Sequence, residues 1–248
     1  MLETLTPQEL KIMRSVGKVA ASFFRRLKKK VHPGISTKDI EVFFDNYLNQ
    51  YSNMEPAFKG FHGYPSSVCV SVNEEIIHGI PSSKVINDGD IVSVDIGIRY
   101  KGLYLDTAYT YTVGKVPGLA KKLISVTRDA LEAGIQKARV GKKVGDIGAA
   151  IQRVVEANGF SVIRKFVGHG IGKELHLSPE IPNFGEEGQG CELREGMVIA
   201  IEPMVAAGDY QVQISSDGWT AKTKDNSLAV HFEHTVAITK RGPKILTY

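Results

Sequence analysis

The segment Asp88-Gly-Asp-Ile-Val-Ser-Val-Asp95 returns 107 positions later in a similar form, as Glu195-Gly-Met-Val-Ile-Ala-Ile-Glu202. Each copy begins with an acidic residue and a glycine, continues through an apolar run rich in strand formers, and ends in a carboxylate. Other pairs match at the same offset: Gly34 with Gly141, Asp39-Ile40 with Asp146-Ile147, and His62-Gly63 with His169-Gly170. This shared offset predicts two related halves, roughly residues 1–110 and 111–248, and a cleft between such halves is a favoured place for a binding site.

Helix and strand signals follow one another along the chain without a low-complexity linker. Thr6-Pro7-Gln8-Glu9 combines a hydroxyl cap, a proline at the first helical position and a glutamate at the third, which is typical of a helix start. The helix stops before Pro33-Gly34, and Ser36 with Asp39 caps a second one. Further helices are expected over 119–138 and 144–157, and strands over 67–72, 91–100, 103–113, 161–166, 197–205 and 228–239. We therefore expect one domain over residues 1–248.

The composition is ordinary for a globular chain, with 42% hydrophobic and 23% charged residues. No apolar run approaches the roughly 18 residues of a membrane span, and the opening Met1-Leu2-Glu3-Thr4 has no secretory pattern. Cys69 and Cys191 lack a CxxC spacing and suit a reducing compartment. We expect a cytoplasmic protein with no membrane partner.

The net charge of +4 is too small to predict nucleic-acid binding. The one basic cluster, Arg25-Arg26-Leu27-Lys28-Lys29-Lys30, falls at the end of the first expected helix. Positive side chains there complement the helix dipole. We therefore interpret the cluster as a solvated helix end and expect no specific nucleic-acid partner.

Four carboxylates lie inside otherwise apolar strand segments. They are Asp95, Asp106, Glu202 and Glu233. Any one of them alone fits the wet face of a half-exposed strand. Four together predict a cluster, and because buried carboxylates are costly and repel one another, protons or cations must compensate them. Two divalent cations would balance the four negative charges.

The spacing of Asp95 and Asp106 decides how close two of these carboxylates come. If the hairpin turns about Tyr100-Lys101, the two side chains lie opposite each other, with Cβ atoms about 5 Å apart. If the turn is centred on Lys101-Gly102, Asp95 faces Ala108 instead. Two close carboxylates can hold two metal ions roughly 3.5–4 Å apart, as in two-metal hydrolysis.

Three of the seven histidines lie in contexts that suggest chemistry. His169 is flanked by glycines in Phe166-Val-Gly-His-Gly-Ile-Gly172, which would let the backbone approach a bound group closely. His78 lies in Ile76-Ile-His-Gly-Ile-Pro81, and His176 lies shortly before Pro179. His32, His62 and His231 are expected to be structural or surface residues.

Other catalytic patterns are missing from the sequence. No Gly-Lys-Ser/Thr follows the glycines around His169, and neither an HExxH zinc helix nor a serine nucleophile elbow occurs. A set of carboxylates with one imidazole favours manganese, iron, cobalt or zinc.

Taken together, these motifs resemble the type I methionine aminopeptidases, which have the pita-bread metallopeptidase fold. The segments that carry the resemblance are Phe61–Cys69, Val72–Pro81, Asp88–Asp95, Gly168–Gly172, Glu195–Pro203 and Phe232–Thr235. The resemblance implies an α+β fold with a curved antiparallel β-sheet, helices on its outer face and two pseudo-symmetric halves. No zinc-finger extension or long late insert is visible, which favours the short bacterial form.

The resemblance also implies roles for individual residues. Asp95 would bind one metal ion, His169 and Glu202 the other, and Asp106 and Glu233 would bridge both. Glu202 would also be the general base. The substrate would be bound by His78 and His176, which stabilise the tetrahedral intermediate, and by a methionine pocket with Tyr64, Cys69, Trp219, Phe61 and Leu175. Phe61 and Leu175 stand where some relatives have tyrosine and phenylalanine, so this part of the pocket departs from the family pattern.

The implied function is a dinuclear metal-dependent aminopeptidase. It would remove the N-terminal methionine from nascent proteins and peptides when the second residue is small, by attack of a metal-activated water on the first peptide bond. Two divalent ions (Co, Mn, Fe or Zn) are the implied cofactors, the ribosome is a possible partner, and the chain is expected to be a monomer. Two alternatives stay open. Prolidases and proline-specific aminopeptidases share the five ligands but usually carry an additional N-terminal domain, and non-catalytic relatives tend to lose ligands.

Overall fold

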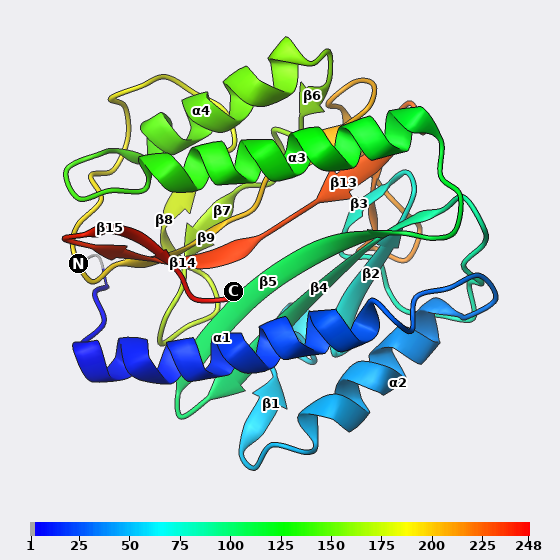
Figure 1. The fold of residues 1–248 in the computed structure, drawn as a ribbon, viewed down its shortest axis with the longest axis horizontal. Coiled ribbons are helices and arrows are strands. Elements are labelled where there is room, and N and C mark those ends of the chain that lie inside the picture. The colour runs from blue at the N-terminus through cyan, green and yellow to red at the C-terminus, as the bar shows by residue number, and fades with distance from the viewer. Residues whose placement is uncertain (1–2) are drawn as a thin grey trace.

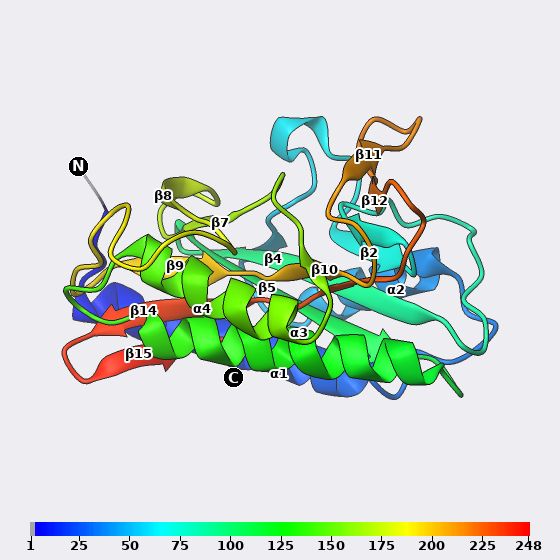
Figure 2. The ribbon, with the colours of Figure 1, turned by 90° about the horizontal axis from the view of Figure 1, so that it is seen from above.

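Helices gather on one side of the strands in the computed structural model, which describes residues 3–248 (Figures 1 and 2). In Figure 2, α1 (Pro7–Leu27) and α3 (Gly118–Lys137) lie below the strands, whereas η1 (Phe61–Gly63) and β11 (Val212–Ile214) lie above them. The other two helices are α2 (Thr37–Leu48) and α4 (Val144–Ala157). Antiparallel strands with helices on one face confirm the expected α+β class. Met1 and Leu2 of the expected domain lie outside the described residues.

The helix starts expected from the sequence are confirmed by capping boxes. Thr6 Oγ1 accepts a hydrogen bond from the Glu9 N–H at 3.3 Å, and Glu9 Oε2 accepts one from the Thr6 N–H at 2.8 Å. Ser36 and Asp39 form the same two reciprocal hydrogen bonds between side chain and backbone at the start of α2. Such boxes satisfy donors that the first helical turn leaves free. None of the helices in the described part of the chain has the length and apolar character needed to cross a membrane.

The first half is built on a four-stranded antiparallel sheet. Its centre is the hairpin of β4 (Ile91–Tyr100) and β5 (Leu103–Thr112), and β4 also pairs with β1 (Met54–Pro56) and β2 (Val68–Val72). Figure 1 shows β5 curving across the molecule between α1 and the second half. The expected strands of this half are thus present.

The β4–β5 turn is centred on Lys101-Gly102, because Tyr100 pairs with Leu103. Lys101 has φ 52° and Gly102 has φ 75°. Positive φ at both central residues is what a tight two-residue turn needs to match the twist of its strands. The alternative turn at Tyr100-Lys101 is therefore wrong.

This register changes the relation between the two aspartates of the hairpin. Asp95 faces Ala108, and Asp106 faces Gly97, so the expectation that Asp95 and Asp106 lie directly opposite each other is wrong. The shift is two residues, and side chains alternate with a period of two, so both aspartates still project from the same face of the sheet. They are diagonal neighbours across the hairpin.

The second half holds a five-stranded antiparallel sheet in the order β15–β14–β9–β7–β8. Its strands are β7 (Gly168–Gly170), β8 (Leu177–Ile181), β9 (Val198–Ile201), β14 (His234–Thr239) and β15 (Gly242–Ile245). Two three-stranded sheets complete the described fold. One contains β6 (Ser161–Val162), β10 (Met204–Ala206) and β13 (Ala229–His231), and the other β3 (Glu75–Ile77), β11 and β12 (Ala221–Thr223).

Three strands expected in the second half are shorter or interrupted. The run 197–205 breaks at Glu202-Pro203, where proline cannot donate to a ladder, and continues as β10. The run 228–239 breaks at Phe232-Glu233, because the Glu233 N–H donates to the Ala108 carbonyl of β5 at 3.0 Å. The run 161–166 ends at Val162, after which the chain leaves its sheet and lines a cavity at Phe166.

The two halves have separate hydrophobic clusters that meet at the strands. One cluster lies between α1, α2 and the β4–β5 sheet, the other between α3, α4 and the β9–β14 sheet, and Tyr109 packs against both. Hydrogen bonds also cross between the halves: Thr235 Oγ1 donates to the Asp106 carbonyl at 2.6 Å, and Thr107 Oγ1 donates to the Glu233 carbonyl at 2.8 Å. Carboxylate-bearing segments from both halves are thereby held together.

Candidate active site

All twelve residues predicted for the site line one cavity of about 560 Å³. They are Phe61, Tyr64, Cys69, His78, Asp95, Asp106, His169, Leu175, His176, Glu202, Trp219 and Glu233. They come from both halves, and η1, which contributes Phe61, lies on the side of the strands away from α1 and α3 (Figure 2). The cavity therefore lies at the junction that the internal repeat predicted.

Three carboxylates form one group in this cavity. Asp95 comes from β4, Asp106 from β5, and Glu233 from the break between β13 and β14, and one oxygen of each lies within 4.8 Å of the others. Asp95 Oδ1, Asp106 Oδ1 and Glu233 Oε1 are buried without a hydrogen-bond partner among residues 3–248. Buried anionic oxygens that lack protein donors are expected where a cation is bound.

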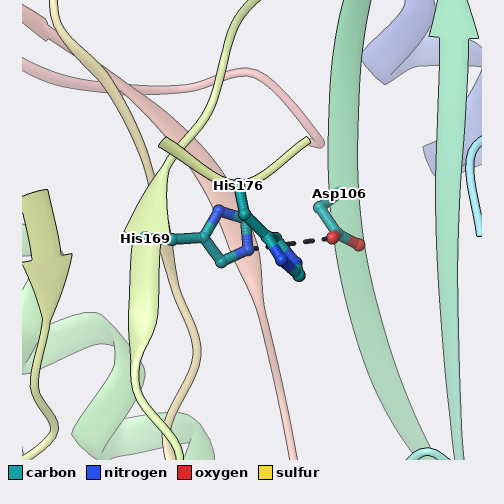
Figure 3. A group of neighbouring side chains, drawn as sticks. All are labelled: Asp106, His169 and His176. Atoms are coloured by element: carbon teal, nitrogen blue, oxygen red, sulfur yellow. Dashed lines mark ion pairs between the residues drawn. The ribbon is translucent and has the colours of Figure 1, made fainter. Parts of the chain in front are cut away.

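A second group joins His169 and Glu202 to Glu233, again with ligand atoms within 4.8 Å of one another. His169 Nε2 lies 3.6 Å from Glu202 Oε1 and 3.9 Å from Asp106 Oδ2, the contact drawn in Figure 3. His169 Nδ1 lies 2.9 Å from the Gly170 carbonyl. Because a carbonyl can only accept, Nδ1 carries the proton, and the Nε2 lone pair is free to bind a metal ion.

The pKa values of these groups are shifted toward their neutral forms. Burial, with repulsion from neighbouring carboxylates, raises the pKa of Asp95, Glu202 and Glu233 well above the usual range. Burial also raises the pKa of Asp106 to about 7. The pKa of His169 falls to about 3, because burial and the adjacent His176 disfavour its charged form. A cation would reverse the carboxylate shifts, and a neutral imidazole is the form that binds metals.

The donor set fits a pair of divalent cations. The group Asp95, Asp106 and Glu233 supplies only oxygens, and the group His169, Glu202 and Glu233 adds one nitrogen. Glu233 belongs to both groups, and Asp106 also approaches His169, as bridging ligands would. Oxygen-rich sites with imidazole suit manganese, iron, cobalt and zinc.

Two further histidines line the cavity, and one of them, His176, forms a third potential metal-binding group with Asp106 and His169. The His176 ring lies beside the His169 ring (Figure 3), with 4.3 Å between the ring centroids. It also lies 5.1 Å from the Phe61 ring, centroid to centroid. His78 lies 5.7 Å from the Phe166 ring, and burial lowers its pKa to about 4. Partial burial, and then the nearby His62, also lower the pKa of His176. Neutral imidazoles can each donate one hydrogen bond into the cavity.

An apolar wall borders the cavity on the side of η1 and β12. Tyr64 packs edge-on against Trp219 at 5.2 Å, and its hydroxyl lies 3.0 Å from the Gly79 carbonyl. Burial raises the pKa of the Cys69 thiol, which keeps it neutral. Leu175 is also buried. The wall can therefore receive an uncharged side chain.

Two residues outside the predicted site contact Glu202. His231, expected to be structural or surface, is buried, with Nε2 3.5 Å from Glu202 Oε2. Its position two residues before Glu233 does not reveal this contact, because the strand breaks at Phe232-Glu233. Asn183 is also buried and donates to the Glu202 carbonyl at 3.0 Å. No sequence pattern points to Asn183. His62, in contrast, is exposed at the cavity rim, and His32 is exposed at the end of α1.

Comparison with known proteins agrees with this geometry. The sequence model described as metallopeptidase family M24 matches residues 11–240. Methionine aminopeptidase 1 of Bacillus subtilis (strain 168) is 47% identical over 247 residues, covering 100% of this chain and 99% of the relative.

Solved structures extend the comparison to the fold. Methionine aminopeptidase from Thermotoga maritima has a TM-score of 0.97 and 48% identity, over 100% of this chain and 99% of that one. Prolidase from Pyrococcus furiosus has a TM-score of 0.80 at 22% identity, over 99% of this chain and 65% of that one, a likeness of fold alone. The expected pita-bread fold is confirmed.

Proposed function

The chain belongs to metallopeptidase family M24, and on this premise we propose that it removes N-terminal methionine from peptides and nascent proteins whose second residue is small. One observation carries the proposal: five potential metal ligands from both halves converge in one cavity beside an apolar wall. The similarity to methionine aminopeptidases along the whole chain supports the choice of methionine.

The proposed cofactors are two divalent ions, chosen from cobalt, manganese, iron and zinc. Asp95 would hold one ion, His169 and Glu202 the other, and Asp106 and Glu233 would bridge them. Ions bound there would polarise the first peptide carbonyl and lower the pKa of water to near neutrality. The unpartnered buried oxygens of Asp95, Asp106 and Glu233 support these assignments.

Three residues of the chain would carry the proton and hydrogen-bond steps. Glu202 would accept the proton of the attacking water and pass it to the leaving amine, acting as general base and then as general acid. His176 would donate a hydrogen bond to the oxyanion that develops on the carbonyl, a contact often worth several kcal/mol. His78 would donate a hydrogen bond to the bound peptide and orient it.

The apolar wall would select the methionine side chain. Tyr64, Cys69 and Trp219 would contact the thioether, with Phe61 and Leu175 at the edges of the pocket. Burial of Tyr64, Cys69 and Leu175 supports this role, because transfer of a thioether from water to an apolar pocket is favourable. The requirement for a small second residue is part of the same proposal, and a series of Met-Xaa peptides would test it.

The cellular setting is also proposed. The chain would act as a monomeric catalytic domain spanning residues 1–248, in the cytoplasm, on chains that emerge from the ribosome. Free Cys69 and Cys191 support a reducing compartment. Gel filtration, cell fractionation and co-sedimentation with ribosomes would test the three statements separately.

The direct experiment measures methionine release from Met-Ala and Met-Gly peptides by the purified chain loaded with Mn²⁺, Co²⁺ or Fe²⁺. We expect release that a chelator abolishes, and its loss in Glu202→Gln, which keeps the shape of the side chain. Xaa-Pro peptides provide the comparison for a prolidase. Intact methionyl peptides at every metal loading would contradict the proposal, and cleavage of Xaa-Pro peptides alone would replace it.

A further inference from the structure

A buried imidazole that has no part in the proposed steps lies against Glu202. His231 ends β13, is 1% exposed, and its Nε2 lies 3.5 Å from Glu202 Oε2. That nitrogen is buried and makes no hydrogen bond with any described residue. A polar atom taken out of water without a partner costs free energy, so its placement beside a carboxylate points to a role.

The backbone of His231 is held on two sides. Thr110 Oγ1 donates to the His231 carbonyl at 2.7 Å and accepts from the His231 N–H at 3.3 Å. Because the single Thr110 hydroxyl proton goes to His231, Ser93 donates to Thr110 at 2.7 Å. On the other side, His231 pairs with Met204 in β10. The ring therefore projects from a fixed strand.

The two carboxylate oxygens of Glu202 face different partners. Oε1 lies 3.6 Å from His169 Nε2, within the group that can hold a cation, and Oε2 lies 3.5 Å from His231 Nε2. The Glu202 backbone is fixed separately, because Asn183 donates to its carbonyl. The side-chain torsions of Glu202 thus depend on what its two oxygens contact.

We propose that His231 is a positioning residue that donates its Nε2–H to Glu202 Oε2 and thereby keeps Oε1 directed toward His169. A neutral imidazole with its proton on Nε2 supplies that donor. The contact becomes an ordinary hydrogen bond if it shortens by a few tenths of an ångström. The consequence for turnover rests on the proposed function, whereas the consequence for cation binding rests only on the geometry of Glu202.

Two substitutions separate donation from packing. His231→Gln keeps a neutral donor, and His231→Leu fills similar space without one. The matched control is His234→Leu in β14, which removes a half-buried imidazole whose Nδ1 lies 2.8 Å from Thr247 Oγ1. Mn²⁺ affinity is measured by calorimetry without substrate, kcat and KM are measured on a Met-Ala peptide, and melting temperatures check folding.

We expect His231→Leu to weaken Mn²⁺ binding and to lower kcat, each by roughly 10- to 100-fold, as loss of a ligand-orienting partner typically does. KM should stay within about twofold, because substrate contacts are unchanged. His231→Gln should recover most of both values, and His234→Leu should change only the melting temperature. If His231→Leu does not fold, His231→Met provides the same test.

Equal Mn²⁺ affinity in His231→Leu and His231→Gln would overturn the proposal, as would an equal loss in His234→Leu. A wild-type chain that binds Mn²⁺ but cleaves no methionyl peptide would count against the proposed function alone. In that case the Mn²⁺ titration still decides whether His231 orients Glu202.

Discussion

Thr235 ties the two halves of the molecule together at Asp106: its Oγ1 donates to the Asp106 carbonyl at 2.6 Å and accepts from the Asp106 N–H at 3.1 Å. Thr235 is fully buried and lies two residues after Glu233. The hydroxyl therefore sets the distance between the strand that carries one carboxylate and the segment that carries another.

Replacing Thr235 by valine keeps its shape and removes both hydrogen bonds. Two buried backbone groups of Asp106 lose their partner, so we expect a loss of about 1–3 kcal/mol in the free energy of unfolding. Cation binding should weaken as well, because the two strands are no longer held in register. Urea denaturation and Mn²⁺ calorimetry measure the two effects.

The control for that variant is Thr239→Val on the same strand. The Thr239 hydroxyl donates to the Gly242 carbonyl at 2.7 Å, at the hairpin between β14 and β15. The Thr239→Val protein should be less stable than the wild type but bind Mn²⁺ with the same affinity. A Thr235→Val protein that binds Mn²⁺ like the wild type would show that the tie does not shape the site.

Removal of divalent ions should destabilise the folded chain. The buried carboxylates of Asp95, Asp106 and Glu233 then repel one another or take up protons. An ion at 100 times its dissociation constant adds about 2.7 kcal/mol to stability. Melting curves with Mn²⁺ and with a chelator should therefore differ by several degrees.

Two variants test whether the change in melting temperature arises from Mn²⁺ bound at the carboxylates of the cavity. Glu233→Gln should lose most of the Mn²⁺-dependent shift, whereas Glu195→Gln, whose carboxylate pairs with Lys240 at 3.5 Å, should keep it. Identical melting curves of the wild type with and without Mn²⁺ would mean that the carboxylates do not bind the ion.

Glu41 gives the structure a pH dependence outside the cavity. Its carboxylate accepts hydrogen bonds from Ser66 Oγ at 2.5 Å and the Ser67 N–H at 3.1 Å, and it pairs with Lys38. Burial alone would raise the pKa of Glu41, but these contacts outweigh it and hold the pKa below the ordinary 4.5.

A depressed folded pKa stabilises the protein above the unfolded pKa, and that stabilisation is lost as the pH falls through the folded value. Glu41→Gln should therefore cost about 1–3 kcal/mol at pH 7. The difference from the wild type should shrink below about pH 4.5. Urea unfolding from pH 7 to pH 3.5 measures it, and a difference that is independent of pH would contradict the assignment.

Trp219 should contribute to methionine selection. Its ring packs against Tyr64 on the apolar wall, and such aromatic contacts contribute about 0.5–1.5 kcal/mol beyond burial. Trp219→Ala should raise KM for a Met-Ala peptide by about tenfold and change kcat less. Tyr210→Ala removes an aromatic residue that is 42% exposed and should leave both constants unchanged. If Trp219→Ala leaves KM unchanged, Trp219 does not contribute to binding the methionine side chain.

Much of this arrangement was readable from the sequence because it depends on local rules and repetition. The capping residues Thr6 and Ser36 identify helix starts, since they satisfy donors that every helix leaves free. The offset between Asp95 and Glu202 identifies the two halves, because duplicated strands end in the same kind of side chain. The residues of the cavity followed from the family motifs.

The hairpin register, one strand break and the surroundings of His231 could not be predicted, because they depend on backbone conformation and tertiary contacts. Lys101 adopts a positive φ although Asn, Asp or Gly is the usual turn signal, so the hairpin register could not be decided. Pro203 was a signal for the break in its strand, although the strand was expected to run unbroken over 197–205. The break at Glu233 has no such signal, because it arises from a hydrogen bond to Ala108 in the other half. The contact of His231 with Glu202 lacks a sequence signal for the same reason: its neighbours are set by tertiary packing.

The most direct measurement of the central claim is anomalous diffraction from crystals grown with Mn²⁺. The account predicts two peaks in the cavity, roughly 3.5–4 Å apart, with Asp106 and Glu233 between them, Asp95 beside one and His169 and Glu202 beside the other. A cavity without anomalous signal, or Mn²⁺ bound only to other carboxylates, would contradict the account.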